Sequence, residues 1–198
     1  GGKRRTTEAK DRGRGVPQGS PISPLLANLY LRRFVVGWRE SGREATLKAK
    51  IVSYADDLVI CCRYEEDAKR IKNVLGKRLS KYNLALNEEK TKMVNFSKNK
   101  SRQGIKQESF EYLGFCFYLG KSRKGVIIPK LKTSGKRFRS KLKRVAEWAK
   151  GVRNKAKLGD IWKIFCSKLR GHVQYYGVSF NGPMVETFLL EAKKIIFK

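Results

Sequence analysis

The run IVSYADDLVI, residues 51–60, places two adjacent carboxylates, Asp56 and Asp57, in the middle of apolar residues that read as two short β-strands. Neighbouring carboxylates repel each other, and burying an unpaired charge is costly. The pattern therefore predicts a tight hairpin with both aspartates at one end. An ordinary surface turn has this pattern, and so does a sheet edge whose carboxylate oxygens hold divalent cations. On these residues alone both interpretations stay open.

Charge indicates the kind of partner. The 198 residues contain 46 Lys and Arg against 17 Asp and Glu, which gives a formal net charge of +29. Such an excess favours a polyanion, and nucleic acid is a better match than a membrane, because no apolar run approaches the ~20 residues of a spanning helix. No signal peptide opens the chain, so we expect a bacterial cytoplasmic or organellar matrix protein that is not secreted.

Histidine and cysteine restrict the possible chemistry. His172 is the one histidine, so a histidine-rich metal site and a Ser-His-Asp mechanism are both disfavoured. The four cysteines include no C-x-x-C pair, and we expect reduced, buried thiols. Any metal must then be held by oxygen.

Periodicity predicts an α+β fold for most of the chain. Residues 1–14 combine glycine with charge and are expected to be a flexible lead-in, whereas Ser23-Pro24 is a plausible start for a helix that continues to Trp38. The other predicted elements are an amphipathic helix over 65–83, short strands at 84–87 and 92–96, and a hairpin formed by 110–120 and 125–131.

From Thr133 onward the pattern is helical, with three apolar stripes that can share one core. The stripes are Phe138, Leu142, Val145, Ala149 and Val152; Leu158, Ile161, Phe165, Leu169 and Val173; and Val185, Phe188, Leu189, Ala192 and Ile196.

Positive charge is concentrated around the first of these helices. Between Lys121 and Lys157 there are fifteen Lys or Arg and one acid, Glu147. Four cations lie roughly opposite the first apolar stripe at 100° per residue, and we call them the basic ridge: Lys136, Arg139, Lys143 and Lys150. A solvated helix face usually mixes both signs, so this one predicts a surface that follows phosphates.

Together these features fit nucleotidyl transfer. Joining a 3′-hydroxyl to an α-phosphate uses two metal ions about 3.5–4 Å apart, and Asp56 and Asp57 would supply part of their ligands. Lys90 is a candidate cation or acid near the leaving pyrophosphate. A lysine beside carboxylates can equally be a salt-bridge partner, so this role stays a hypothesis.

Four blocks, in this order, resemble the palm motifs of reverse transcriptases of the group II intron-encoded type: GVPQGSPISPLLANLYL, YADDLVI, LNEEKTKMVNF and FEYLGF. The segment LRGHVQYYGVSF, residues 169–180, is similar to the thumb or maturase-associated region of that family. The resemblance implies a partial right-hand polymerase palm over residues 15–131, with an antiparallel sheet and helices, followed by a three-helix thumb over 132–198.

The resemblance also implies roles for individual residues. Asp56 and Asp57 would bind two Mg²⁺ ions, with Tyr54 and Ala55 beside the primer terminus. Pro17, Gln18 and Gly19 would line the nucleotide and template pocket, and Tyr112, Leu113 and Gly114 would form the primer grip. Each group has a plain alternative, since Pro17 to Gly19 could be an ordinary turn and Tyr112-Leu113 ordinary core. The implied partners are an RNA template, a DNA or RNA primer, dNTP and structured intron RNA.

The blocks that precede Gly15 in the family, the fingers and a first palm strand with another metal-binding aspartate, have no counterpart here. Asp11 lies in a charged context and is not assigned that role. We therefore expect little polymerase activity from this chain alone. It could be a fragment, one half of a split enzyme completed by an upstream polypeptide, or a decayed relative. The alternative function is a non-catalytic maturase module that binds and stabilises intron RNA.

Overall fold

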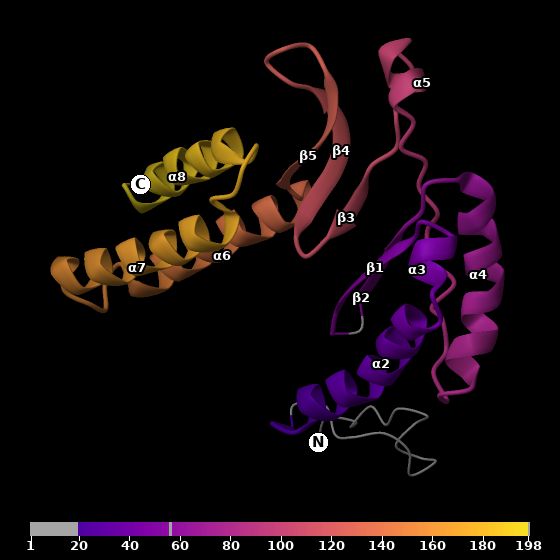
Figure 1. Ribbon diagram of the computed structural model, residues 1–198. Coiled ribbons are helices and arrows are strands. Elements are labelled where there is room, and N and C mark those ends of the chain that lie inside the picture. Colours follow the sequence, from indigo (N-terminus) through magenta and orange to yellow (C-terminus); the bar gives the residue numbers. More distant parts are fainter. Residues whose placement is uncertain (1–19, 56, 198) are drawn as a thin grey trace. The chain divides into compact units, whose positions relative to one another are not determined.

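The chain forms two compact units, Gly1–Met93 and Val94–Lys198, which we call the first and second units (Figure 1). The structure is a computed structural model that describes residues 20–55 and 57–197. Within these residues there are two antiparallel sheets and seven helices, so the predicted α+β class is confirmed. The predicted division into palm and thumb at residues 131 and 132 is a functional division that this split does not test, and it stays a prediction.

The first unit consists of a two-stranded hairpin and helices. Its elements are α2 (Ser23–Glu40), α3 (Arg43–Thr46), β1 (Lys50–Tyr54), β2 (Asp57–Cys61) and α4 (Glu65–Ser80). Both long helices and the hairpin were predicted from the sequence. The sequence of α4 also suits its ends, because acids occupy its first turn and Lys77 and Arg78 its last, each opposite in sign to the helix dipole.

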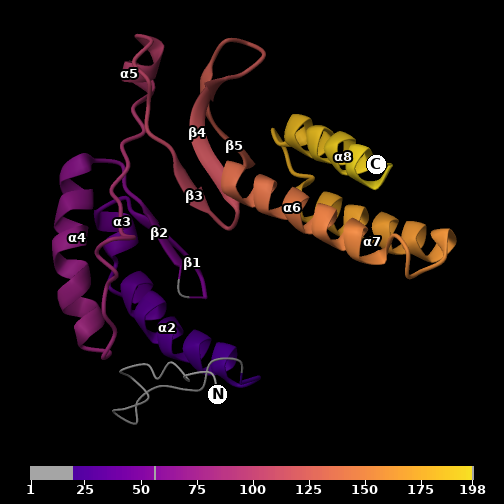
Figure 2. The same ribbon diagram turned by 180° about the vertical axis from the view of Figure 1, so that it is seen from behind.

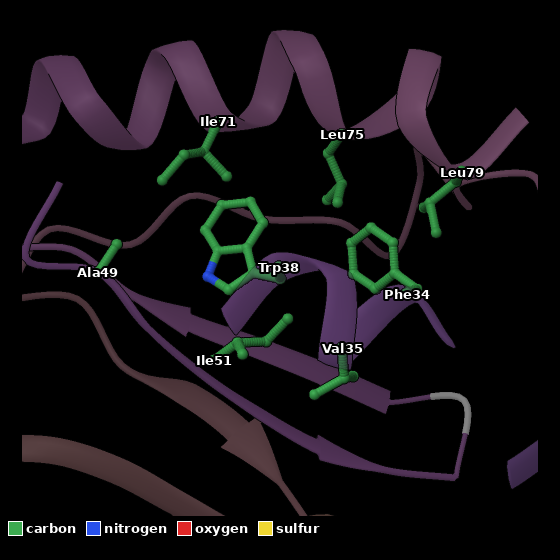
Figure 3. Packing of buried hydrophobic residues seen from close by; sticks show 8 residues of the cluster. All are labelled: Phe34, Val35, Trp38, Ala49, Ile51, Ile71, Leu75 and Leu79. Carbon is green, nitrogen blue, oxygen red and sulfur yellow. The ribbon is translucent and has the colours of Figure 1, made fainter. Parts of the chain in front are cut away.

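The core of the first unit lies between α2, α4 and the first strand (Figure 3). Phe34 and Trp38 of α2 are four residues apart, so they lie on one helix face and turn towards α4. Three α4 side chains at the same spacing, Ile71, Leu75 and Leu79, face them, while Ala49 and Ile51 close the cluster from the hairpin side. Burying each large apolar side chain contributes about 1.5–3 kcal/mol. This cluster holds the Asp-Asp hairpin to the helices.

Two predicted strands are absent from the described chain. Residues 84–87 and 92–96, all of them described, have no strand assignment. Leu84 and Leu86 do alternate inward and pack against the first-unit core. An alternating pattern requires only one buried face, whereas a strand also requires a neighbouring backbone, and no strand of the described hairpin pairs with this segment.

The second unit combines a three-stranded sheet with a helical bundle. Its elements are α5 (Lys98–Arg102), β3 (Phe110–Tyr112), β4 (Phe115–Lys121), β5 (Ile127–Thr133), α6 (Gly135–Val152), α7 (Leu158–Tyr176) and α8 (Gly182–Ile196). The sheet is antiparallel in the order β3-β4-β5, with Tyr112 opposite Phe115 and Lys121 opposite Ile127. The predicted hairpin is thus confirmed, with a further tight turn inside its first arm.

The three predicted helices are confirmed, and α8 lies against α6 and α7 (Figure 2). Their shared core contains Val145, Phe165, Phe188 and Ala192. The stripe predicted for α7 is partly wrong, because Leu158 is 80% exposed and Val173 is also exposed. His172 and Tyr176 are buried instead.

Burial of the thiols was also predicted wrongly. All four cysteines are free, but Cys61 is exposed and Cys62, Cys116 and Cys166 are half-buried. Cys61 ends the short β2 strand, where no third strand of the described chain covers it. None of the described helices is both long and apolar enough to cross a membrane.

Candidate active site and nucleic-acid interface

The Asp-Asp hairpin ends in a two-residue connection. Tyr54 of β1 pairs with Asp57 of β2, so Ala55 and Asp56 alone link the strands. Ala55 has a φ of 50°, in the left-handed region that residues with a Cβ adopt at a cost of about 1–2 kcal/mol. Strained backbone of this kind gathers at functional sites. The strain at Ala55 is therefore a structural reason to suspect function at this turn.

The hairpin carries its polar groups outward. Asp57 is exposed, and the Tyr54 side chain beside it is 64% exposed. Ile51, four residues before Ala55, is in the core. The apolar strand thus anchors the hairpin at one end while its carboxylate end stays open to solvent, which explains how Asp57 avoids the cost of burial.

Four further predicted site residues lie outside the described residues: Pro17, Gln18, Gly19 and Asp56. Lys90 is described and exposed, in a turn where its backbone N–H donates to the Asn87 carbonyl at 3.2 Å and to the Asn87 Oδ1 at 3.1 Å. Between Lys90 and Asp57, both described, there is no ion pair. A salt bridge to Asp56 lies outside the described residues, so both the catalytic role of Lys90 and its salt-bridge alternative stay predictions.

The donor chemistry of the hairpin suits a hard divalent cation. Asp57 offers exposed carboxylate oxygens, the ligand type that Mg²⁺ prefers. Among the described residues, no three His, Cys, Asp or Glu side chains gather into a group that could hold a metal ion. The assignment of Asp56 and Asp57 as metal ligands therefore stays a prediction, and Asp56 lies outside the described residues.

The predicted primer grip is a second tight turn, between β3 and β4. Leu113 and Gly114 have φ angles of 50° and 79°, and positive values at both central residues define a type I′ turn. A Cβ placed on Gly114 would lie 2.9 Å from the Tyr176 Oη and 3.7 Å from the Arg137 Cγ. Glycine is required here both for its backbone angle and for this close approach.

Hydrogen bonds fasten this turn from two sides. The Tyr175 Oη donates to the Leu113 carbonyl at 2.9 Å, and the Ser134 N–H donates to the Gly114 carbonyl at 2.9 Å. The Ser134 hydroxyl also donates to the Glu111 Oε1 at 2.7 Å. The Leu113–Gly114 turn is therefore held by residues 20 or more positions away, and the positions of its carbonyls are set by the second unit as a whole.

Asn181 links the helices to the strand that supports the turn. Its Oδ1 accepts from the Thr133 N–H at 2.7 Å, and its Nδ2 donates to the Tyr176 carbonyl at 2.8 Å and the Thr133 Oγ1 at 2.9 Å. Asn181, Thr133 and Ser134 are all essentially inaccessible to water. A buried, fully bonded network of this kind favours one arrangement of its elements.

Aromatic rings fill the space behind the turn. The Tyr176 ring lies 5.1 Å from Phe115 and 4.7 Å from His172, and His172 stacks on Phe188 at 3.6 Å between ring centres. Burial, with a smaller contribution from the Lys141 charge, lowers the pKa of His172 to about 4. Neither ring nitrogen of His172 has a hydrogen-bond partner among the described residues. At neutral pH this histidine is thus an uncharged member of these packed rings.

All four cations of the basic ridge are exposed on α6: Lys136, Arg139, Lys143 and Lys150. One of them, Lys143, approaches Glu147 at 3.9 Å. Since both partners of this pair are largely exposed, it contributes little stability. The ridge is available to a polyanion, although its assignment to nucleic acid stays a prediction.

Sequence reasoning missed the residues that fasten the turn. Asn181 precedes a Gly-Pro helix start, a position typical of an N-cap, yet its side chain makes no cap bond to α8 and bonds Thr133 instead. Tyr175 is within the segment that resembles the family thumb, but a lone tyrosine pair carries no signal for a bond to residue 113. Neither contact has a local sequence pattern.

Comparison with known proteins adds one result to this geometry. No curated protein matches the chain. Residues 3–117, more than half of the chain, match the family described as "Reverse transcriptase (RNA-dependent DNA polymerase)". That range includes the strained Asp-Asp hairpin and the Leu113–Gly114 turn. The chain belongs to the reverse transcriptase family.

Proposed function

We propose that this protein is the catalytic part of an RNA-directed DNA polymerase of the group II intron type, working by two-metal-ion nucleotidyl transfer. The observation that carries the proposal is the β1–β2 hairpin, whose two-residue connection brings Asp57 to an exposed end beside Tyr54 and a strained Ala55. Family membership supplies the reaction class, and the hairpin supplies the residues.

In this proposal the carboxylates of Asp56 and Asp57 hold Mg²⁺. When bound, two such ions would stabilise charge on the attacking and leaving oxygens. Tyr54 and Ala55 lie beside the primer terminus, and Pro17, Gln18 and Gly19 line the pocket for dNTP and template. Lys90, with its exposed ammonium, acts at the leaving pyrophosphate.

The second unit grips the nucleic acid. Tyr112, Leu113 and Gly114 form the primer grip, which is supported by the preset carbonyl positions of that turn. The basic ridge follows the phosphates of the template–primer duplex, and its four exposed cations support this role. Residues 15–131 serve as palm and 132–198 as thumb.

An upstream polypeptide completes the site. The resemblance implies a further metal-binding aspartate on a strand before Gly15, and none of the sequence blocks described above contains it. A pair of carboxylates leaves several ligand positions of two Mg²⁺ ions to other groups. We therefore propose that fingers and the first palm strand reach this chain from another polypeptide or from a preceding part of the same one.

Primer extension tests this function. An RNA template with an annealed primer, dNTPs and Mg²⁺ is given to the chain alone and to the chain mixed with the polypeptide encoded immediately upstream. Extension in the mixture alone supports a split enzyme. Extension by the chain alone would show that the site is complete without the upstream part, and Asp11 would then be tested as the additional ligand.

A second candidate function is a maturase module that binds structured intron RNA without catalysis. The basic ridge favours it, since an exposed row of cations is sufficient for binding RNA by its phosphates. Tight, salt-sensitive binding of intron RNA with no extension in either reaction would establish it in place of the polymerase. Both functions imply a compartment that contains the RNA, a bacterial cytoplasm or an organelle matrix.

A further inference from the structure

The second unit contains a cavity that is lined by residues of the segment 101–109 and of the strands β4 and β5. Its volume is about 360 Å³. Pockets that hold small molecules in proteins usually have volumes of about 300–1,000 Å³. None of the residues that line this cavity in the described chain has a role in the proposed function. The cavity is therefore available for a different ligand.

Hydrogen bonds hold the segment that forms one side of the cavity. The Gln107 Oε1 accepts from the Ser97 N–H at 3.1 Å, and the Gln107 Nε2 donates to the Ile105 carbonyl at 2.9 Å. The Ile105 N–H donates to the Lys100 carbonyl at 3.1 Å. This side of the cavity is thus held in place before a ligand binds, which lowers the cost of ordering on binding.

The cavity carries positive charge. Its described lining includes two lysines, Lys106 and Lys132, and no acid. Both lysines are exposed, and neither has a carboxylate partner among the described residues. Glu111, which lies opposite Cys116 in the β3–β4 ladder, accepts a hydrogen bond from the Ser134 hydroxyl. Two ammonium groups at one cavity favour an anionic ligand, since hydrogen bonds between oppositely charged groups are the strong ones.

The cavity also has an apolar side. Ile105, Tyr118 and Leu119 contribute to its lining, and Tyr118 and Leu119 are half-buried. The Lys132 Nζ lies 5.2 Å from the centre of the Tyr118 ring, so this ammonium group is next to the apolar surface. A phosphodiester of a passing nucleic acid strand would leave the apolar side empty. A small molecule that combines a charged group with a ring fits both parts of the cavity.

We propose that this cavity binds a small aromatic anion, such as an aromatic carboxylate or sulfonate. Lys106 and Lys132 hold its charged group, and its ring packs against Ile105 and Tyr118. The site does not rest on the proposed function, because it requires neither metal ions nor a template.

Two double variants of equal charge test the site. Lys106→Gln with Lys132→Gln removes the cations of the cavity, and Lys98→Gln with Lys124→Gln removes two exposed lysines that do not line it. Each full chain is titrated with anilinonaphthalene sulfonate, an aromatic anion whose fluorescence rises in an apolar site, and with its neutral analogue phenylnaphthylamine. We expect the cavity variant to bind the anion at least about 10-fold more weakly than the control variant, and both variants to bind the neutral analogue alike. Equal affinities of the two variants for the anion would overturn the proposal.

The thiol of Cys116 reports where the probe binds. Cys116 lines the cavity and is half-buried, whereas the exposed Cys61 does not line it. Alkylation of the unaltered chain by N-ethylmaleimide is followed by mass spectrometry with and without saturating anilinonaphthalene sulfonate. Cys116 should react several-fold more slowly when the probe is bound, and Cys61 at the same rate in both samples. An unchanged rate at Cys116 contradicts the site.

A competition experiment separates a small anion from nucleic acid as the ligand. An RNA–DNA duplex is added to the chain saturated with anilinonaphthalene sulfonate. We expect the probe to stay bound, because the duplex binds elsewhere. Release of the probe by the duplex, seen as a loss of its fluorescence, would assign the cavity to nucleic acid and overturn the proposal. These readouts do not depend on primer extension, so the site and the proposed function can fail separately.

Discussion

The two hairpin turns of this protein have the same length but differ in how other residues hold them. Each links its strands by two residues and includes a non-glycine residue in the left-handed region, Ala55 in one and Leu113 in the other. The Leu113–Gly114 turn is fastened by Tyr175 and Ser134, whereas Tyr54 and Asp57 at the first turn are exposed.

This difference matches what each turn has to hold in the proposed function. A turn that positions a strand benefits from carbonyls and rings that are already fixed, because little ordering remains to be done on binding. A turn that holds metal ions must keep its carboxylates free of other partners. The comparison therefore predicts that changes at the first turn affect chemistry and changes at the second affect folding.

The largest effect should follow from neutralising the first turn. In the mixture that extends primers, Asp56→Asn with Asp57→Asn should lower the extension rate at least about 100-fold, because charge stabilisation at the reacting oxygens is lost. The thermal midpoint should change little, since Asp57 is exposed. Glu88→Gln with Glu89→Gln, a neighbouring exposed pair, is the matched control. Equal losses of extension in both double variants would contradict the assignment of Asp56 and Asp57 as the metal-binding residues.

Removing Asn181 should have the largest effect on folding. Asn181→Ala leaves the buried Thr133 N–H and Tyr176 carbonyl without their partner, at a cost of about 3 kcal/mol in the free energy of unfolding of the second unit. Urea unfolding followed by tryptophan fluorescence measures it. The exposed Asn154→Ala should cost less than about 0.5 kcal/mol. A similar small cost for Asn181→Ala would show that the network does not support the turn.

Acid should destabilise the packed rings around His172 behind the Leu113–Gly114 turn. His172 has a pKa of about 4 in the folded protein and about 6.5 when unfolded, so between these values the unfolded chain binds more protons. The contribution of His172 to the free energy of unfolding is therefore fully present above pH 6.5. It is lost as the pH drops towards 4, which lowers the free energy of unfolding by up to about 3 kcal/mol. The His172→Phe variant should lack this part of the pH dependence. Identical pH profiles of the two proteins would exclude the burial of a neutral imidazole.

The smallest predicted difference isolates one contact. Gly114 and Gly125 have similar φ angles, 79° and 74°, but a Cβ at Gly125 meets nothing within 4 Å whereas one at Gly114 meets the Tyr176 Oη. Changing each to alanine should cost about 1 kcal/mol at Gly125 and about 1–2 kcal/mol more at Gly114. Thermal or urea unfolding measures both. Equal costs would mean that Tyr176 moves aside without penalty.

Much of the fold could be predicted from local pattern. The four-residue spacing of Ile71, Leu75 and Leu79, close to one helical turn, predicted α4, and the apolar run around Asp56 and Asp57 predicted the first hairpin, because both signals depend on neighbours a few residues apart. The same reasoning failed at residues 84–87. Their alternation indicated a buried face, but strand formation depends on a partner whose presence no local pattern reports.

The sequence by itself determined the charge, the helices and the exposed carboxylate turn, since solvation and helix periodicity act within a few residues. Only the tertiary structure decided that Asn181 bonds Thr133 across 48 residues, that the Tyr175 hydroxyl bonds the Leu113 carbonyl, and that Arg137 lies beside Gly114. Such contacts depend on which helix faces pack together, and packing is decided by the shapes of many side chains at once.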